Sequence, residues 1–216
     1  MRVFIPVFLV ALAFPCFAQT RAEEAKVAAY TAVTLGPWEI IYRDDVQADL
    51  GLAAETRAKL KEIKSETYAE STKIYRETPK GEARDKILAL NKAQQEKVQG
   101  LVTPEQKVRI REIHLQLLGG AAALEPEVSV QLGITDEQKV KFAAIQEKRR
   151  AEAKAFLEKV RARQTTVNKG MVEMTKKNLE FDDELRKVLT PEQTVKLKSL
   201  LGKPFVPTPI PTGKGG

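Results

Sequence analysis

The sequence predicts an all-α protein, and three observations lead to this prediction. Ala, Glu, Lys, Gln and Leu are abundant while aromatic residues make up only 6% of the chain, a composition typical of long amphipathic helices rather than of β-sandwiches. Apolar residues recur at helical steps between charged residues, as at Phe142, Ile145, Ala153 and Phe156. Four short segments also carry all or part of a helix-start pattern, and they occur in two pairs.

The first 18 residues have the features of a secretory signal peptide. Arg2 provides a basic start, residues 3–14 are almost wholly apolar, and Ala18 is the small residue before the expected cut. The apolar run is shorter than the roughly 20 residues that a transmembrane helix needs, so we expect a cleaved signal rather than a retained anchor. The sequence therefore predicts a periplasmic or secreted protein whose mature form begins near Gln19 and has no transmembrane anchor.

Cysteine content and charge exclude several classes of site. Cys16 is the only cysteine and lies inside the predicted signal, so the mature chain should lack disulfides, zinc–thiolate sites and cysteine nucleophiles. The 36 basic and 29 acidic residues give a moderate net charge of +7. Nucleic acid is a poor candidate partner for an exported protein, and the sequence contains no recognition module with interleaved aromatic residues.

The chain contains an internal repeat. Residues 46–55 align with residues 128–137 at an offset of 82, and residues 102–106 align with residues 189–193 at an offset of 87. Two matching pairs in the same order predict two tandem units, residues 44–120 and residues 121–202. We expect each unit to be a helical hairpin with short capping helices, and we hypothesise that the two units pack as an internal pseudo-dimer.

Each unit is expected to contain the same helices in the same order. A short helix comes first and ends at Gly51 or Gly133, where a left-handed residue is favoured. The two long helices of the hairpin follow, and a last short helix closes the unit. The short helices are expected at residues 44–50, 104–118, 126–132 and 191–201, and the hairpin turns at residues 79–81 and around residues 168–170.

The two ends of the mature chain are expected to differ from the helical units. Residues 19–43 are a lead in which residues 23–30 are compatible with a short helix, and residues 38–42 with either a brief strand or a segment packed on the bundle. Residues 203–216 contain four prolines and three glycines. This composition cannot form a helix and predicts an extended, mobile tail.

The repeated Thr-x-x-Gln segments are interpreted as helix caps. The threonine oxygen accepts a hydrogen bond from the backbone N–H three residues later, and the glutamine reaches back to the threonine N–H, which closes a capping box. At the fourth site Ala53 and Thr56 replace threonine and glutamine, so we expect that cap to be weaker by about 1 kcal/mol. The three intact boxes are Thr103 with Gln106, Thr135 with Gln138, and Thr190 with Gln193.

These paired motifs in an exported, cysteine-free helical chain resemble the LTxxQ motifs of the Spy/CpxP family of periplasmic proteins. The resemblance rests on residues 102–106, 134–138 and 189–193, with residues 52–56 as a degraded copy, and covers roughly residues 44–202. It implies an ATP-independent chaperone or an envelope-stress regulator, in which helices form a shallow cradle, usually as a dimer, with basic and apolar surface facing the client. Family members usually carry one unit, so two units in one chain depart from the pattern.

A basic segment is the main candidate for partner binding. Residues 138–163 contain nine basic and three acidic residues, which would attract an acidic client, anionic lipid or cell-wall polymer. The alternative is an ordinary solvated helix face. The candidate anionic-partner face consists of Lys148, Arg149, Arg150, Lys154 and Arg161.

The sequence offers no candidate catalytic, cofactor or metal site. His114 is the only histidine, so it lacks the further ligands of a metal site, and Met171 and Met174 are better explained by core packing. We therefore expect a binding protein rather than an enzyme. It would be either a chaperone-like protein that holds unfolded clients or a regulatory or structural envelope protein with one defined partner, as a monomer or a homodimer.

Overall fold

The computed structural model describes residues 36–208, without the side chains of residues 80, 167–172 and 175. Within that part the protein has eight α-helices, two short 3-10 helices and no strand, which confirms the all-α prediction. The elements are η1 (Ile40–Tyr42), α2 (Asp44–Asp49), α3 (Ala54–Glu77), α4 (Lys80–Gln99), α5 (Pro104–Leu118), η2 (Gly119–Leu124), α6 (Pro126–Leu132), α7 (Asp136–Arg161), α8 (Val167–Val188) and α9 (Pro191–Leu200).

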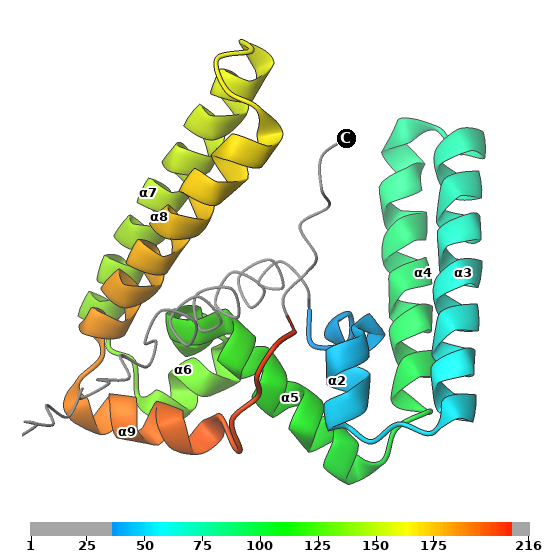
Figure 1. Ribbon diagram of the computed structural model, residues 1–216, viewed down its shortest axis with the longest axis horizontal. Coiled ribbons are helices and arrows are strands. Elements are labelled where there is room, and N and C mark those ends of the chain that lie inside the picture. The colour runs from blue at the N-terminus through cyan, green and yellow to red at the C-terminus, as the bar shows by residue number, and fades with distance from the viewer. Residues whose placement is uncertain (1–35, 209–216) are drawn as a thin grey trace, which may run out of the picture.

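Two antiparallel helix pairs rise from a layer of shorter helices (Figure 1). Helix α3 packs along α4, and α7 packs along α8. The layer beneath them contains α2, α5, α6 and α9. Helix α5 contacts η1 at one side and η2 at the other, so it connects the two halves of this layer.

The buried apolar side chains form two core clusters rather than one. The first lies among η1, α2, α5 and the near ends of α3 and α4, and the second among η2, α6, α9 and the near ends of α7 and α8. Helix α5 contributes Ile110 and Ile113 to the first cluster and Leu115 to the second. The outer parts of the long helices are held mainly by their pairing with each other.

Two short helices, α2 and α6, are followed by a glycine in the left-handed conformation, as predicted. Gly51 and Gly133 have φ values of +61° and +65°, in the left-handed region. At each, the next residue's N–H bonds a carbonyl five residues back, as Leu52 does to Gln47 and Ile134 to Ser129. This is the helix ending predicted from the sequence.

The first hairpin turn lies at residues 78–79, so it overlaps the predicted residues 79–81 only at Pro79, and the second turn does not lie where it was predicted. Helix α3 ends before Pro79, whereas α7 ends at Arg161 and α8 already begins at Val167. The prediction of a turn around residues 168–170 is therefore wrong. Arg163 takes the left-handed position with φ +55°, and the N–H of Gln164 bonds the carbonyl of Lys159. Gly170 lies within helix α8. A glycine in a helix interior lowers the stability of the helix by only about 1 kcal/mol relative to alanine.

The chain ends are described in part. Residues 38–42 form no strand, because η1 places Ile40 and Ile41 fully inside the first core, which agrees with the packing alternative. The predicted signal peptide and the expected helix at residues 23–30 lie outside the described residues. Among the described helices none is long and apolar enough to cross a membrane. Residues 203–208 form no helix, as predicted, and hydrogen bonds join them to α5 and α2. The mobility of the tail stays a prediction.

Candidate functional site

The three intact Thr-x-x-Gln segments form complete capping boxes. The N–H of Gln106 donates to Thr103 Oγ1 at 3.3 Å, and the N–H of Thr103 donates to Gln106 Oε1 at 3.0 Å. The boxes at α7 and α9 have the same two bonds. At the degraded fourth site, Ala53 makes no side-chain cap. The geometry of all four sites agrees with the interpretation of the motif as a helix start.

The capping glutamines also join the two motifs of a pair, which the sequence analysis did not anticipate. Gln138 Nε2 donates to the carbonyl of Val188 at 2.9 Å, at the end of α8, and to Gln193 Oε1 at 2.7 Å. Gln193 Nε2 lies 3.3 Å from the carbonyl of Leu132, at the end of α6, and 3.0 Å from Gln138 Oε1. Both glutamines are buried. Each glutamine therefore caps its own helix and also donates to a carbonyl at the end of the helix that precedes the other motif. That helix is α8 for Gln138 and α6 for Gln193.

Only half of this arrangement exists in the first half of the chain. Gln106 Nε2 donates to the carbonyl of Leu50 at 3.1 Å, as Gln193 does to Leu132. The reciprocal bond is lost because Thr56 stands where a glutamine would be required. The motifs are thus structural junctions between helix ends.

The five residues of the candidate anionic-partner face do not lie on one side of α7. Successive residues of a helix are about 100° apart, so Arg150, Lys154 and Arg161 share one side. Lys148 lies on the opposite side, where its Nζ is 3.2 Å from Glu184 Oε2. Arg149 points between them and is half-buried. Leu157, which is 52% exposed, belongs to the same side as Arg150.

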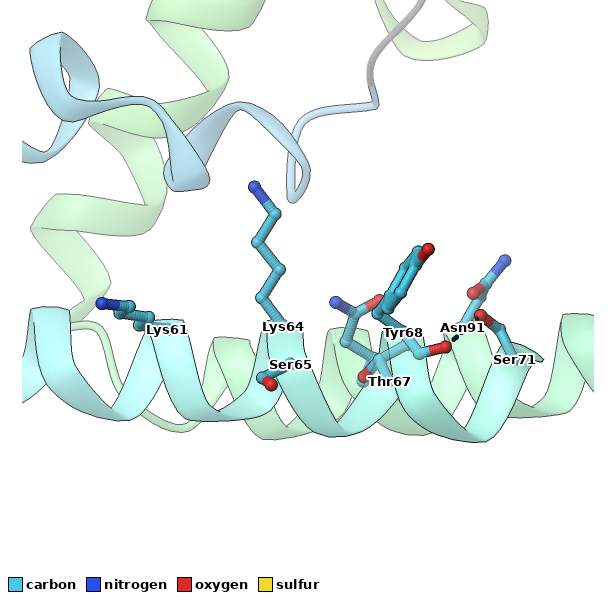
Figure 2. Close-up of a pocket in the computed structure, with 8 residues that line it drawn as sticks. Lys61, Lys64, Ser65, Thr67, Tyr68, Ser71 and Asn91 are labelled. Carbon is cyan, nitrogen blue, oxygen red and sulfur yellow. Dashed lines mark hydrogen bonds between the residues drawn. The ribbon is translucent and has the colours of Figure 1, made fainter. Parts of the chain in front are cut away.

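A shallow, open groove of about 460 Å³ runs along the pair α3–α4 (Figure 2). Lys61, Lys64 and Tyr68 project from one side of α3, and Asn91 lies beside them on α4. No acidic residue is among those lining the groove, which are Lys61, Lys64, Ser65, Thr67, Tyr68, Ser71, Asn91 and Gln94.

Helical spacing explains why the groove has no carboxylate. Lys61, Lys64, Tyr68 and Tyr75 follow one another at steps of three, four and seven residues, so they form one stripe on α3, which we call the tyrosine stripe. The acidic residues of α3 lie on the other side of the helix, where Glu66 pairs with Lys97 of α4 at 3.4 Å. They are Glu55, Glu62, Glu66, Glu70 and Glu77.

The tyrosine stripe is exposed although it carries aromatic rings. Tyr68 and Tyr75 are 74% and 69% exposed, and Leu88 on the adjacent side of α4 is 58% exposed. Buried Ile74 and Leu60 hold α3 against its neighbours, so the core does not need these tyrosines. An exposed aromatic stripe next to lysines is an arrangement suited to contact with another molecule.

The inner end of the groove is fixed to the first core. Gln94 Nε2 donates to Tyr42 Oη at 2.9 Å, and Lys64 Nζ lies 5.4 Å from the centre of the Tyr42 ring. Burial raises the pKa of the Tyr42 phenol, and the bond from Gln94 opposes that shift. Tyr42 is therefore a neutral phenol that packs beside Lys64 and is fixed by Gln94.

The described residues contain no cluster of three or more His, Cys, Asp or Glu side chains that could hold a metal ion. His114 is buried in α5.

No family model, curated protein or solved structure matches this chain. The resemblance to the Spy/CpxP family therefore stays a prediction from the motifs.

Proposed function

We propose that this is a chaperone-like binding protein of the cell envelope, which holds protein clients without ATP. The observation that carries the proposal is the tyrosine stripe, where two exposed tyrosines lie in line with two lysines and apart from the acidic residues of α3. The envelope location rests on the predicted signal peptide.

The chemistry of the stripe favours a protein client. Tyrosine offers a large apolar ring with one polar atom, and tyrosine is enriched where proteins contact each other. Lysines without neighbouring carboxylates attract acidic segments and raise the rate of encounter. A client segment with apolar and acidic residues would satisfy both parts of the stripe.

We further propose that the chain consists of two duplicated hairpin units. Buried residues of the first core align with buried residues of the second at the offsets of the sequence repeat, which supports this relationship. The aligned pairs are Val46 with Val128, Leu50 with Leu132, Leu52 with Ile134, Leu60 with Phe142, Val98 with Leu185, Val102 with Leu189, and Ile110 with Leu197. On this reading one chain supplies both units, and a tight dimer in sedimentation velocity would contradict it.

The two proposed units differ at their outer surfaces. Arg150 and Leu157 occupy the positions that align with Tyr68 and Tyr75. The second surface keeps one apolar residue but gains the basic residues Lys154 and Arg161. We infer that the first hairpin provides most of the apolar contact and the second most of the attraction for acidic groups.

Suppression of aggregation tests this function. The protein is mixed without ATP with a reduced, acidic model protein such as α-lactalbumin, and light scattering is followed at 0.05 M and 0.5 M salt. We expect Tyr68→Ser with Tyr75→Ser to raise the concentration for half suppression by about ten-fold, since two lost contacts of about 0.7 kcal/mol each give that factor. High salt should weaken suppression by the parent protein, because it screens the lysines.

Val108→Ser with Val195→Ser is the matched control, because these side chains are 59% and 69% exposed on α5 and α9, away from the stripe. The control should suppress aggregation as the parent does. An absence of suppression by the parent at several-fold excess would reject the chaperone function and favour an envelope protein with one defined partner.

A further inference from the structure

The chain after α9 returns from the second core to the first. Gly202 turns the backbone with φ +62°. A Cβ at this position would lie 2.0 Å from the carboxylate carbon of Glu112, so the chain passes directly against α5. The red segment in Figure 1 follows this path from the end of α9.

Residues 202–208 are bonded to α5 and α2 along their length. The carbonyl of Lys203 accepts from Arg109 Nη1 at 2.7 Å and from Gln116 Nε2 at 2.8 Å. The N–H of Phe205 donates to Gln116 Oε1 at 2.7 Å, and the N–H of Thr208 donates to Asp45 Oδ2 at 2.8 Å.

Apolar contacts accompany these bonds. The ring of Phe205 packs against the first core cluster, and Pro207 is buried. Val206 between them is 77% exposed. The alternation of inward and outward side chains is that of an extended segment fitted to a surface.

The surface that receives this segment is itself fixed. Arg109 is buried and held by Asp49 at 2.7 Å and by Glu112 at 2.9 Å. Asp45 is held by Arg43 at 2.7 Å. Two of the three polar partners, Arg109 and Asp45, are therefore in position independently of the segment, whereas the described bonds of the Gln116 side chain all go to residues 201–205. Release of the segment would leave α5 and α2 in place.

We propose that residues 202–208 are a strap that fixes the position of the α7–α8 pair relative to the α3–α4 pair. The other described connections between the two cores run through α5. This helix contacts η2, places Leu115 in the second core, pairs with Glu127 of α6 through Arg111 and bonds the carbonyl of Leu201 through Gln116. Without the strap, the second half would be attached through α5 alone and would turn about the junction of α5 and η2. If the proposed client binding holds, the strap sets the spacing of the two client surfaces. The strap would fix the relative position of the two helix pairs whether or not a client is bound.

The distance between the hairpin tips tests the strap. The full sequence is expressed with Cys16→Ser, Glu82→Cys and Gln164→Cys, and nitroxide labels are placed at the two exposed tip positions. Pulsed electron spin resonance then gives the distribution of label distances. Phe205→Ala with Gln116→Ala removes the strap's ring contact and all bonds of Gln116 to the chain after α9, at residues 201, 203 and 205. Val206→Ala is the matched control because that side chain faces solvent.

We expect a narrow distribution for the parent and for Val206→Ala, and a distribution about two-fold broader for the strap variant. Helical circular dichroism should be unchanged in all three proteins. An unaltered distribution in the strap variant would overturn the proposal. A loss of helical signal would also overturn it, because residues 202–208 would then be part of the folding core rather than a separable strap. Neither result depends on the aggregation assay, so failure of the strap and failure of the proposed function are distinguishable.

Discussion

Replacement of Arg109 by methionine is expected to lower the free energy of unfolding by about 3 kcal/mol, because it leaves the largely buried carboxylate of Asp49 without the guanidinium that bonds both of its oxygens. The guanidinium bonds Asp49 through two nitrogens, at 2.7 Å and 3.1 Å, and also bonds Glu112 and the carbonyl of Lys203. Methionine keeps much of the aliphatic volume, so the loss should come from the polar partners. Urea unfolding followed by circular dichroism measures it.

The same substitution should change the pH dependence of stability. The hydrogen bond from Arg109 lowers the pKa of the Asp49 carboxyl below its ordinary 3.8. A carboxylate with a lowered folded-state pKa stabilises the fold above the unfolded pKa and loses that contribution as the pH falls through the folded pKa. The gap in stability between the parent and Arg109→Met should therefore be full above about pH 5 and narrow below the unfolded pKa.

Lys107→Met is the control, because Lys107 is an exposed residue of the same helix. Its free energy of unfolding should stay within about 0.5 kcal/mol of the parent. If Arg109→Met cost no more than this control, the ionic contacts of α5 would not stabilise the junction of the two halves.

Replacement of the paired glutamines Gln138 and Gln193 is expected to have the second large effect on the free energy of unfolding. We expect Gln193→Ala to lower the free energy of unfolding by about 2–3 kcal/mol, because it removes the glutamine half of the capping box of α9 and the donor to the buried carbonyl of Leu132 and to the carbonyl of Gly133. Gln138→Ala should cost a similar amount through Thr135 and Val188. Urea unfolding of both single variants and of the double variant measures the effect.

Gln106→Ala is the natural comparison. It removes the glutamine half of a capping box and the bond to Leu50 but no bond to a partner glutamine, so its cost should be smaller, about 1–2 kcal/mol. The double variant Gln138→Ala with Gln193→Ala should lose less than the two single losses added together, because both single variants break the same bond. Strict additivity would contradict the direct contact between the two amides.

Local patterns account for the parts of the fold that the sequence predicted. Gly51 and Gly133 mark helix ends because a left-handed residue there costs little without a Cβ. The threonine and glutamine of each box act within three residues of each other, so their spacing is sufficient. The second turn was misplaced because Gly170 is a local signal, whereas α7 ends at Arg161. The left-handed position that follows is taken by Arg163, a residue type that seldom adopts this conformation.

Contacts between distant segments account for what the sequence did not predict. The second bond of Gln193 reaches a helix end some 60 residues away, at Gly133, and no local pattern encodes it. The composition of the tail predicts extended backbone at Phe205 but not its docking on Gln116. Lys148 and Arg150 lie on opposite sides of α7, because residues two apart in a helix are separated by about 200° around its axis. This separation could have been predicted from their spacing.

The tyrosine stripe is an intermediate case. Its spacing is visible in the sequence, but Tyr75 directly follows Ile74, and one of the two could have been the core residue. The structure buries Ile74 and exposes Tyr75. The stripe is therefore a candidate surface only once the fold is known.

Site-specific photocrosslinking tests directly whether a client binds at the tyrosine stripe. Benzoylphenylalanine is placed at Tyr68, or at Glu70 on the acidic side of the same helix, and each protein is irradiated with the reduced acidic client. We expect crosslinks to the client from position 68 and few from position 70. A concentration of 0.5 M salt should lower the crosslink yield at position 68. Equal yields from the two positions, or none from position 68, would contradict binding through the tyrosine stripe.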